Sequence, residues 1–382
     1  MSSFTTPSPP SSTLHSPLYI VAPMVGCSSP SFRHLCILHS AHYCYTEMYL
    51  STTFATSQNY RLQALGTSIR PEEAGKLIVQ FASNTPETFL SASLEAQKLG
   101  CAGVDLNLGC PQTRARIGNY GAWMTDDHDL CVSIISSACT SPSLTVPVSV
   151  KIRIQEPTPL HSSLERTVEF ALRLAAAGAW IIAVHGRRRG GEDKRRDGSA
   201  DLDVVKAVVT AVREKYPNVV IVANGNVRSP ENVLDNLKHT EAGGVMVAEE
   251  VLRRFDLFSE VELIRLGGGV REGNTMRRKK ERVLEYFKVL ELMSCGEQSR
   301  VLRLEDGSMY GKNGNMVRGT VGDGEEDFER MSMWWTNVEV VKSHVRWMLA
   351  DRGELASRNS FKKAKNVGDI IQGVRRRFGV KE

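Results

Sequence analysis

Short apolar runs alternate with amphipathic stretches along the first 268 residues of the chain. We predict a β-strand at each run: 19–22, 43–46, 77–81, 103–106, 148–152, 180–184, 219–223 and 244–247. Helical spacing separates most of them, at 86–99, 126–139, 163–177, 201–215 and 229–238. Strands that alternate with helices form parallel sheets, and eight such units in about 250 residues predict a closed (β/α)8 TIM barrel. The interval 44–77 is the weakest unit because its helix is not obvious.

The flanking regions differ from this barrel, which we place at 18–268. Residues 1–17 are rich in Ser, Thr and Pro and contain no Lys, Arg, Asp or Glu, so we expect a disordered tail. Residues 274–382 carry helically spaced apolar positions, which predict a smaller all-α domain. These positions are Val283, Tyr286, Phe287, Leu290, Met293, Val338, Val341, Val345 and Met348. We expect Trp334, Trp335 and Trp347 in or near its core, and a flexible insertion at 300–327, which is rich in Gly and charge.

Positive charge is concentrated in the last third of the sequence. Residues 271–382 hold 23 Lys and Arg against 17 Asp and Glu, a net of +6, whereas the whole chain is +5. This excess is either an exposed basic face or a surface that binds a polyanion. No apolar run reaches 18 residues, so we expect no membrane span. Eight cysteines without a CxxC pair predict a reducing compartment and no metal site, and we expect a cytoplasmic monomer.

Polar or conformationally special residues follow nearly every predicted strand. They are Pro23, Met24, Val25, Glu47, Gln80, Asn107, Cys110, Lys151, Arg153, His185, Arg187, Asn224, Gly225, Asn226, Ala248 and Glu249. Any one of them is compatible with ordinary loop polarity. Because the carboxyl ends of all barrel strands meet at one face, we expect the whole set to line one pocket.

Two of these strand ends indicate specific chemistry. Cys110 lies between Gly109 and Pro111, so a shaped loop holds its thiol at a strand end; the alternative is an ordinary buried thiol. The turn 224–226 contains Gly and is followed by a helix start at Ser229. Loops after the last barrel strands often bind phosphate, which predicts a phosphorylated cofactor. No GxGxxG motif follows the first predicted strand and no GxxxxGK[ST] motif is present, so the sequence supports neither a Rossmann fold nor a P-loop fold.

Several longer motifs resemble those of the tRNA-dihydrouridine synthases. They are APMVG (22–26), YTEM (45–48), QF (80–81), DLNLGCPQ with YGA (105–122), KIR (151–153), HGR (185–187), ANGNV (223–227) and GVMVAE (244–249). They span the whole barrel in the order that the family has. The DLNLGCPQ form with Tyr-Gly-Ala is most similar to the eukaryotic branch named for positions 16 and 17 of the tRNA D-loop.

The resemblance implies an FMN-dependent barrel followed by a helical tRNA-binding domain. NADPH, or NADH, would reduce FMN, which would pass hydride to C6 of a uracil while Cys110 protonates C5. The remaining roles are implied in the same way. Pro23, Met24 and Val25 would pack on the flavin, Gln80, Lys151 and His185 would contact it, Asn224, Gly225, Asn226, Ala248 and Glu249 would surround its phosphate, and Glu47, Asn107, Arg153 and Arg187 would face the substrate.

Three departures and two alternatives accompany this resemblance. Glu250 replaces the usual Gly, Arg254-Phe255 replaces Asn-Pro, and the loop 187–198 lacks the usual Thr and carries six basic residues. The first alternative is an FMN barrel that acts on a free pyrimidine, like dihydroorotate dehydrogenase, although those enzymes favour Asn-x-Ser-Cys-Pro-Asn. The second is a tRNA-binding protein without catalysis, which the intact Cys110, Lys151 and His185 disfavour.

Overall fold

The computed structural model describes most of the barrel and part of the region after it. The described residues are 16–190, 198–268, 275–298, 309–310, 316–317, 338–349, 369–370 and 372–373. The predicted tail up to residue 15, most of the basic loop 187–198, and Trp334 and Trp335 lie outside them. Most of the predicted insertion 300–327 also lies outside, apart from the antiparallel pair β10 (Met309–Tyr310) and β11 (Met316–Val317).

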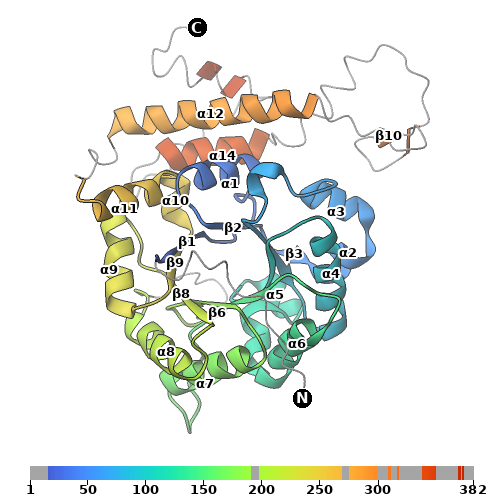
Figure 1. The fold of residues 1–382 in the computed structure, drawn as a ribbon, viewed down its shortest axis with the longest axis vertical. Coiled ribbons are helices and arrows are strands. Elements are labelled where there is room, and N and C mark those ends of the chain that lie inside the picture. The colour runs from blue at the N-terminus through green and yellow to red at the C-terminus, as the bar shows by residue number, and fades with distance from the viewer. Residues whose placement is uncertain are drawn as a thin grey trace.

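Eight parallel strands close into a barrel (Figure 1). They are β1 (Leu18–Val21), β2 (Tyr43–Tyr45), β4 (Leu77–Ala82), β5 (Gly103–Leu108), β6 (Val148–Arg153), β7 (Ile181–His185), β8 (Val220–Asn224) and β9 (Gly244–Val247). The ring closes because β2 pairs with both β1 and β4, while the short β3 (Tyr49–Leu50) extends the edge of β4. All eight predicted strands and the TIM barrel are therefore confirmed.

Helices surround the barrel as the sequence predicts. The principal ones are α1 (Pro30–Leu38), α4 (Pro86–Lys98), α6 (His128–Thr140), α7 (Ser163–Ala176), α8 (Leu202–Lys215) and α9 (Pro230–Thr240). Thr85, Ser162 and Ser229 cap their helices with side-chain oxygens, and Pro follows the cap in α4 and α9. The cap of α6 is Asp127, one residue after the start of the helix predicted at 126–139.

The interval 44–77 contains only short elements, which is why it lacks an amphipathic pattern. They are α2 (Ser51–Thr56), α3 (Gln58–Leu65) and the 3-10 turn η1 (Pro71–Glu73). Other short helices follow the strands at the cavity end or lead into the last third: α5 (Thr113–Ile117), η2 (Gly121–Asp126), α10 (Glu249–Arg253) and α11 (Leu257–Arg265).

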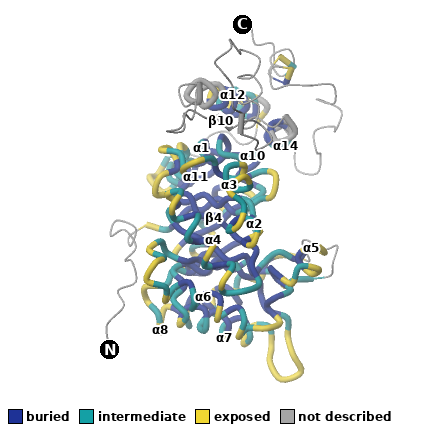
Figure 2. The backbone as a smooth tube through the Cα atoms, turned by 90° about the vertical axis from the view of Figure 1, so that its right-hand side faces the viewer, coloured by how far each residue is buried: buried dark blue, intermediate teal, exposed yellow. Residues whose placement is uncertain are grey.

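The strands are buried on both faces, as in other parallel barrels (Figure 2). One set of alternating side chains, including Ile20, Tyr45, Ile78 and Met246, fills the barrel interior. The other set packs outward against the helices; Val79, which follows Ile78, belongs to it. Because successive side chains point to opposite faces of a strand, this alternation decides which residues reach the barrel mouth.

Two helices of the last third pack against one side of the barrel (Figure 1). These are α12 (Met276–Gln298) and α14 (Val338–Leu349), which contact each other, α1 and α10. The predicted apolar stripes are buried at Val283, Tyr286, Phe287, Leu290, Val341, Val345 and Met348, whereas the side chains of Met293 and Val338 lie outside the described part. The buried residues form one cluster with Val21, Phe32 and Phe255, so the helices share a core with the barrel.

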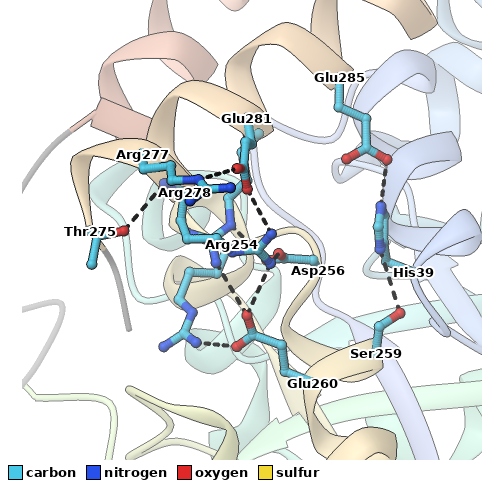
Figure 3. Close-up of polar contacts among 11 residues, drawn as sticks. His39, Arg254, Asp256, Ser259, Glu260, Thr275, Arg277, Arg278, Glu281 and Glu285 are labelled. Atoms are coloured by element: carbon cyan, nitrogen blue, oxygen red, sulfur yellow. Dashed lines mark hydrogen bonds and ion pairs between the residues drawn. The ribbon is translucent and has the colours of Figure 1, made fainter. Parts of the chain in front are cut away.

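A mostly buried ion cluster fastens α12 to the barrel (Figure 3). Asp256 accepts from Arg282 Nε at 2.7 Å and from an Nη of Arg278 at 2.7 Å. Glu260 binds Arg254 and lies 3.5 Å from Arg278. Arg254, one of the departures from the family pattern, is thus part of this cluster. Breaking one partner of a buried ion pair leaves an uncompensated charge, which typically costs about 3–5 kcal/mol.

His344 connects three segments through both nitrogens of its ring. Its Nε2 donates to the carbonyl oxygen of Cys27, 2.9 Å away, and its Nδ1 accepts from the Tyr286 hydroxyl at 2.7 Å. Burial lowers the pKa of His344 to about 4, so the ring stays neutral in the folded protein at neutral pH. The two C-terminal helices are thereby tied to the loop after β1.

We predict that His344 makes the protein acid-sensitive. Its folded pKa lies below that of an unfolded His, near 6.5, so the unfolded state binds a proton first and stability falls as pH drops through this window. Between pH 7 and pH 5 this single group should lower the unfolding free energy by about 2 kcal/mol. Urea titrations should show this loss in the wild type and a smaller one in His344→Gln, whose neutral amide can keep both contacts. Equal losses in the two proteins would contradict the assignment.

Candidate functional site

A cavity of about 700 Å³ opens at the carboxyl ends of the strands. Fifteen of the sixteen residues predicted at strand ends line it: Pro23, Met24, Val25, Gln80, Asn107, Cys110, Lys151, Arg153, His185, Arg187, Asn224, Gly225, Asn226, Ala248 and Glu249. The exception is Glu47, whose carboxylate accepts the Gly26 N–H at 3.0 Å and so supports the loop after β1. The structure therefore brings the predicted set together in one place.

The alternation of side chains explains why these residues meet. Gln80 stands two residues after the inward-facing Ile78, and Asn224 two residues after Val222. The same spacing brings His185 into the cavity two residues after Ala183. These three strands therefore each end with a polar side chain that points inward, directly above the apolar filling of the barrel.

The Cys110 loop is fixed by hydrogen bonds and by close packing. Asn107 Oδ1 accepts the backbone N–H groups of Gly109 and Cys110 at 3.0 and 2.9 Å, and Arg153 Nε donates to the Gly109 carbonyl at 2.7 Å. Gly121, at a φ of +65°, lies so close that an added Cβ would meet the Cys110 carbonyl oxygen at 2.8 Å. The Tyr-Gly-Ala segment thus supports this loop from behind, and Cys110 remains partly exposed.

Three of the basic side chains that line the cavity, Lys151, Arg153 and Arg187, come from β6 and from just after β7. Burial and, to a smaller extent, the nearby charge of Arg153 lower the pKa of Lys151 to about 8, against the opposing effect of Asp105. Burial also lowers the pKa of Arg153 to about 10. Arg187 Nη1 lies 3.2 Å from His185 Nε2, and because guanidinium only donates, this nitrogen of His185 is the acceptor. The site is therefore suited to an anionic ligand.

The turn after β8 is shaped by close contacts. Gly225 has a φ of +126°, and a Cβ there would lie 2.6 Å from the Ala200 Cβ. The Asn226 amide accepts from the Ala200 N–H and donates to its carbonyl, both at 2.8 Å, while Asn224 Nδ2 donates to the Met246 carbonyl at 2.8 Å. The two asparagines therefore hold the turn itself, and only Gly allows its close approach to Ala200.

Sequence reasoning missed several lining residues. Among them are Cys27, Met48, Gln112, Arg228, Leu252, Arg253 and Trp347. Those before residue 254 lie within the strand-end motifs or a few residues after them, so this proximity could have identified them as cavity residues. Trp347 comes from α14, and its ring lies 4.9 Å from the Arg253 guanidinium carbon. No local pattern connects Trp347 to a barrel strand end, since tertiary packing alone brings it there.

Neither a metal site nor a membrane segment is apparent in the described part of the chain. No cluster of three or more His, Cys, Asp or Glu side chains there could hold a metal ion. Likewise, none of the helices described is both long and apolar enough to cross a membrane.

The fold and the site define a TIM barrel with a thiol and a cationic cavity at the carboxyl ends of its strands. The sequence pattern of the dihydrouridine synthase (Dus) family matches residues 20–301, and the chain belongs to this family. It is 38% identical over 240 residues to the tRNA-dihydrouridine(16/17) synthase [NAD(P)(+)]-like protein of Rattus norvegicus, a match that covers 63% of this chain and 51% of that protein.

Two fungal relatives extend this likeness. The tRNA-dihydrouridine(16/17) synthase [NAD(P)(+)] of Schizosaccharomyces pombe is 38% identical over 61% of this chain and 55% of its own length. Its namesake in Saccharomyces cerevisiae is 33% identical over 72% of this chain and 60% of its own length. The chain spans about half the length of the curated relatives it matches most strongly.

We predict that Gly225→Ala destabilises the fold. The substitution places a Cβ against Ala200 at a φ that L-residues rarely adopt, so backbone strain and overpacking together should cost about 3 kcal/mol. Gly75→Ala is the matched control, since Gly75 has a φ of +70° but no atom within 4 Å of the added Cβ. Its cost should stay near 1 kcal/mol. Urea unfolding of both variants measures the difference, and equal costs would contradict the packing argument.

Proposed function

We propose that this protein reduces the C5=C6 bond of specific uridines in tRNA to dihydrouridine, with FMN as the bound cofactor and NADPH or NADH as the reductant. The observation that carries the proposal is the Cys110 loop, which holds a partly exposed thiol at the edge of a cationic cavity. Membership of the dihydrouridine synthase family supports this reading of the site.

The volume of the cavity, the residues that line it and their charge are all compatible with a bound phosphorylated flavin. Its volume of about 700 Å³ lies within the range of cofactor sites. We assign the flat wall of the ring site to Pro23, Met24 and Val25, and the polar edge to Gln80, Lys151 and His185. Gly225, whose missing Cβ keeps the turn close to Ala200, would border the phosphate together with Asn224, Asn226, Ala248 and Glu249. When bound, FMN supplies the hydride that NADPH provides.

We assign the proton of the reaction to Cys110. Hydride addition at C6 of a uracil places an electron pair at C5, which must receive a proton to complete the reduction. The Cys110 thiol gives that proton and then regains one from solvent, so two electrons and two hydrogens are added in all. The bonds from Asn107 to the loop backbone hold the thiol in a defined position.

Basic residues would stabilise the charges that develop in this cavity. We assign Lys151 to the negative charge at the cofactor edge, because a cation there acts where charge accumulates. Arg153, Arg187 and Asn107 line the same cavity as the thiol, so we assign them to the uracil and to the phosphates of its nucleotide. Glu47 acts through Gly26 as a support of the loop after β1.

The names of the relatives support tRNA as the substrate and positions 16 and 17 as its modified uridines. A uracil must leave its stack to reach the cavity, as base-modifying enzymes generally require. We propose that the basic region 274–382 binds tRNA phosphates. Reduction of a free pyrimidine, as in dihydroorotate dehydrogenases, is disfavoured by the Gly-Cys-Pro-Gln form of the loop, and loss of catalysis is disfavoured by the intact cavity.

We predict that Cys110→Ala abolishes tRNA reduction and leaves the cofactor steps intact. Loss of a general acid typically slows a reaction 10²–10⁴-fold. Dihydrouridine formation in unmodified tRNA should fall by this factor, while flavin absorbance and NADPH oxidation stay unchanged. Cys27→Ala is the matched control, because Cys27 is also a free thiol that lines the cavity. Unchanged dihydrouridine formation by Cys110→Ala would overturn the assignment, and so would equal losses in the two variants.

We predict that FMN affinity falls at alkaline pH because Lys151 loses its proton. With a pKa of about 8 the ammonium is largely present at pH 7 and largely absent at pH 9. If only the charged form binds well, the Kd of the apoprotein for FMN should rise about tenfold over this interval. Lys151→Met should bind weakly at both pH values with no such slope. Fluorescence titration of FMN measures both, and an equal slope in the variant would contradict the role of Lys151.

A further inference from the structure

A carboxylate lies inside the barrel, where apolar side chains normally fill the space. Asp105, in the middle of β5, is fully buried and flanked on both sides by partners on neighbouring strands. Burying an acid is unfavourable unless hydrogen bonds and charges compensate. The mechanism proposed above assigns no role to this residue.

An unbroken chain of hydrogen bonds leads from Asp105 to the Cys110 loop. Gln80 Nε2 donates to Asp105 Oδ2 at 2.8 Å, and Asn107 Nδ2 donates to Gln80 Oε1 at 2.8 Å. Asn107 Oδ1 then accepts the Cys110 N–H at 2.9 Å. The three side chains are almost completely inaccessible to solvent, so these contacts compete little with water.

The direction of every bond in this chain is determined by its ends. Backbone N–H groups of Gly109 and Cys110 can only donate, so Asn107 must present its oxygen to them. Its amide nitrogen then faces Gln80, which must present its oxygen and thus turns its own nitrogen towards Asp105. The Gln80 and Asn107 amides are therefore both satisfied only if residue 105 presents an oxygen that accepts a hydrogen bond.

The opposite side of Asp105 is also occupied. Ser149 Oγ lies 2.7 Å from Asp105 Oδ1 and 3.1 Å from the Tyr45 hydroxyl. Burial raises the pKa of Asp105 to about 7, while Ser149, Gln80 and Lys151 act in the opposite direction. If Asp105 binds a proton on the oxygen that faces Ser149, the other oxygen still accepts from Gln80. The chain therefore keeps its direction in both protonation states.

We propose that Asp105 is a positioning residue that, through Gln80 and Asn107, fixes the loop that carries Cys110. Without an acceptor at position 105, Gln80 loses its fixed orientation and Asn107 loses the partner that aims its oxygen at the loop. The thiol then samples more than one position, and misplacement by about 1 Å can cost as much as 10²-fold in rate. The catalytic consequence rests on the proposed function, but the placement of the thiol does not.

Two substitutions at one position test this proposal. Asp105→Leu has a similar shape but removes the acceptor, whereas Asp105→Asn keeps an oxygen for Gln80 and offers its nitrogen to Ser149. Ser149→Ala is the matched control, because it removes the other partner of Asp105 and leaves the chain to Cys110 complete. Each full-length protein is treated with iodoacetamide, alkylation at Cys110 is followed by peptide mass spectrometry, and tRNA reduction is measured in parallel.

We expect Asp105→Leu to alkylate Cys110 about fivefold faster, the equivalent of one net hydrogen bond lost from the loop, and to reduce tRNA 10- to 100-fold more slowly. Asp105→Asn and Ser149→Ala should stay within about threefold of the wild type in both assays, since the chain of bonds survives. Wild-type alkylation in a folded Asp105→Leu protein would overturn the proposal, and so would an equal change in Ser149→Ala.

A second variant keeps the test valid if Asp105→Leu does not fold. Gln80→Leu combined with Asp105→Leu removes both partners of the buried Gln80–Asp105 hydrogen bond, so the Gln80 amide is not left without an acceptor and the change should be tolerated better. It should also accelerate alkylation of Cys110, and an unchanged rate would overturn the proposal. Faster alkylation in these variants, together with a wild type that reduces no tRNA, would support the role of Asp105 and contradict the proposed function instead.

Discussion

The closure of eight parallel strands is the constraint on which the site depends. Closure places all carboxyl ends at one face, and strict alternation sends every second side chain inward. Below the mouth most of these inward positions are apolar, as at Ile78 and Val222, with Asp105 and Ser149 as exceptions; two residues beyond Ile78 and Val222 they are Gln80 and Asn224. A shift of register by one residue would exchange the polar set for outward-facing apolar residues such as Val79 and Val184, so strand pairing itself determines the chemistry of the cavity.

The helices of the last third are part of the same energetic unit as the barrel. Their apolar stripes share one core with β1, and the cluster around Asp256 and Glu260 adds buried charge to the contact. His344 carries this coupling to Cys27, in the loop that lines the cavity. The amino-acid composition changes near residue 270, but the regions before and after this point stabilise each other. Removing the helices would expose a large apolar surface and release the loop proposed to contact the flavin.

Sequence patterns predicted the strands and fifteen of the residues that line the cavity because both depend on local alternation. The short elements between β2 and β4 escaped prediction since they bury too few residues to create a helical period. Trp347 packs against the core as expected, but its place at the cavity could not be predicted because its approach to Arg253 depends on how α14 docks. The inward direction of Asp105 could have been predicted, because it lies two residues before Asn107 on the same strand. The alternating pattern does not indicate, however, that a carboxylate can be buried inside the barrel.

The cavity also explains why cofactor binding and stability should be linked. Lys151, Arg153 and Arg187 repel one another, which is why the charge of Arg153 lowers the pKa of Lys151 and that of Arg187 lowers the pKa of Arg153. An anion bound among them would replace this repulsion by attraction in a region of low dielectric. A ligand that binds only the folded state stabilises it by mass action. The repulsion among these cations in the free protein would therefore favour binding of the proposed phosphorylated cofactor, and the carboxylate of Asp105 offsets part of it at Lys151.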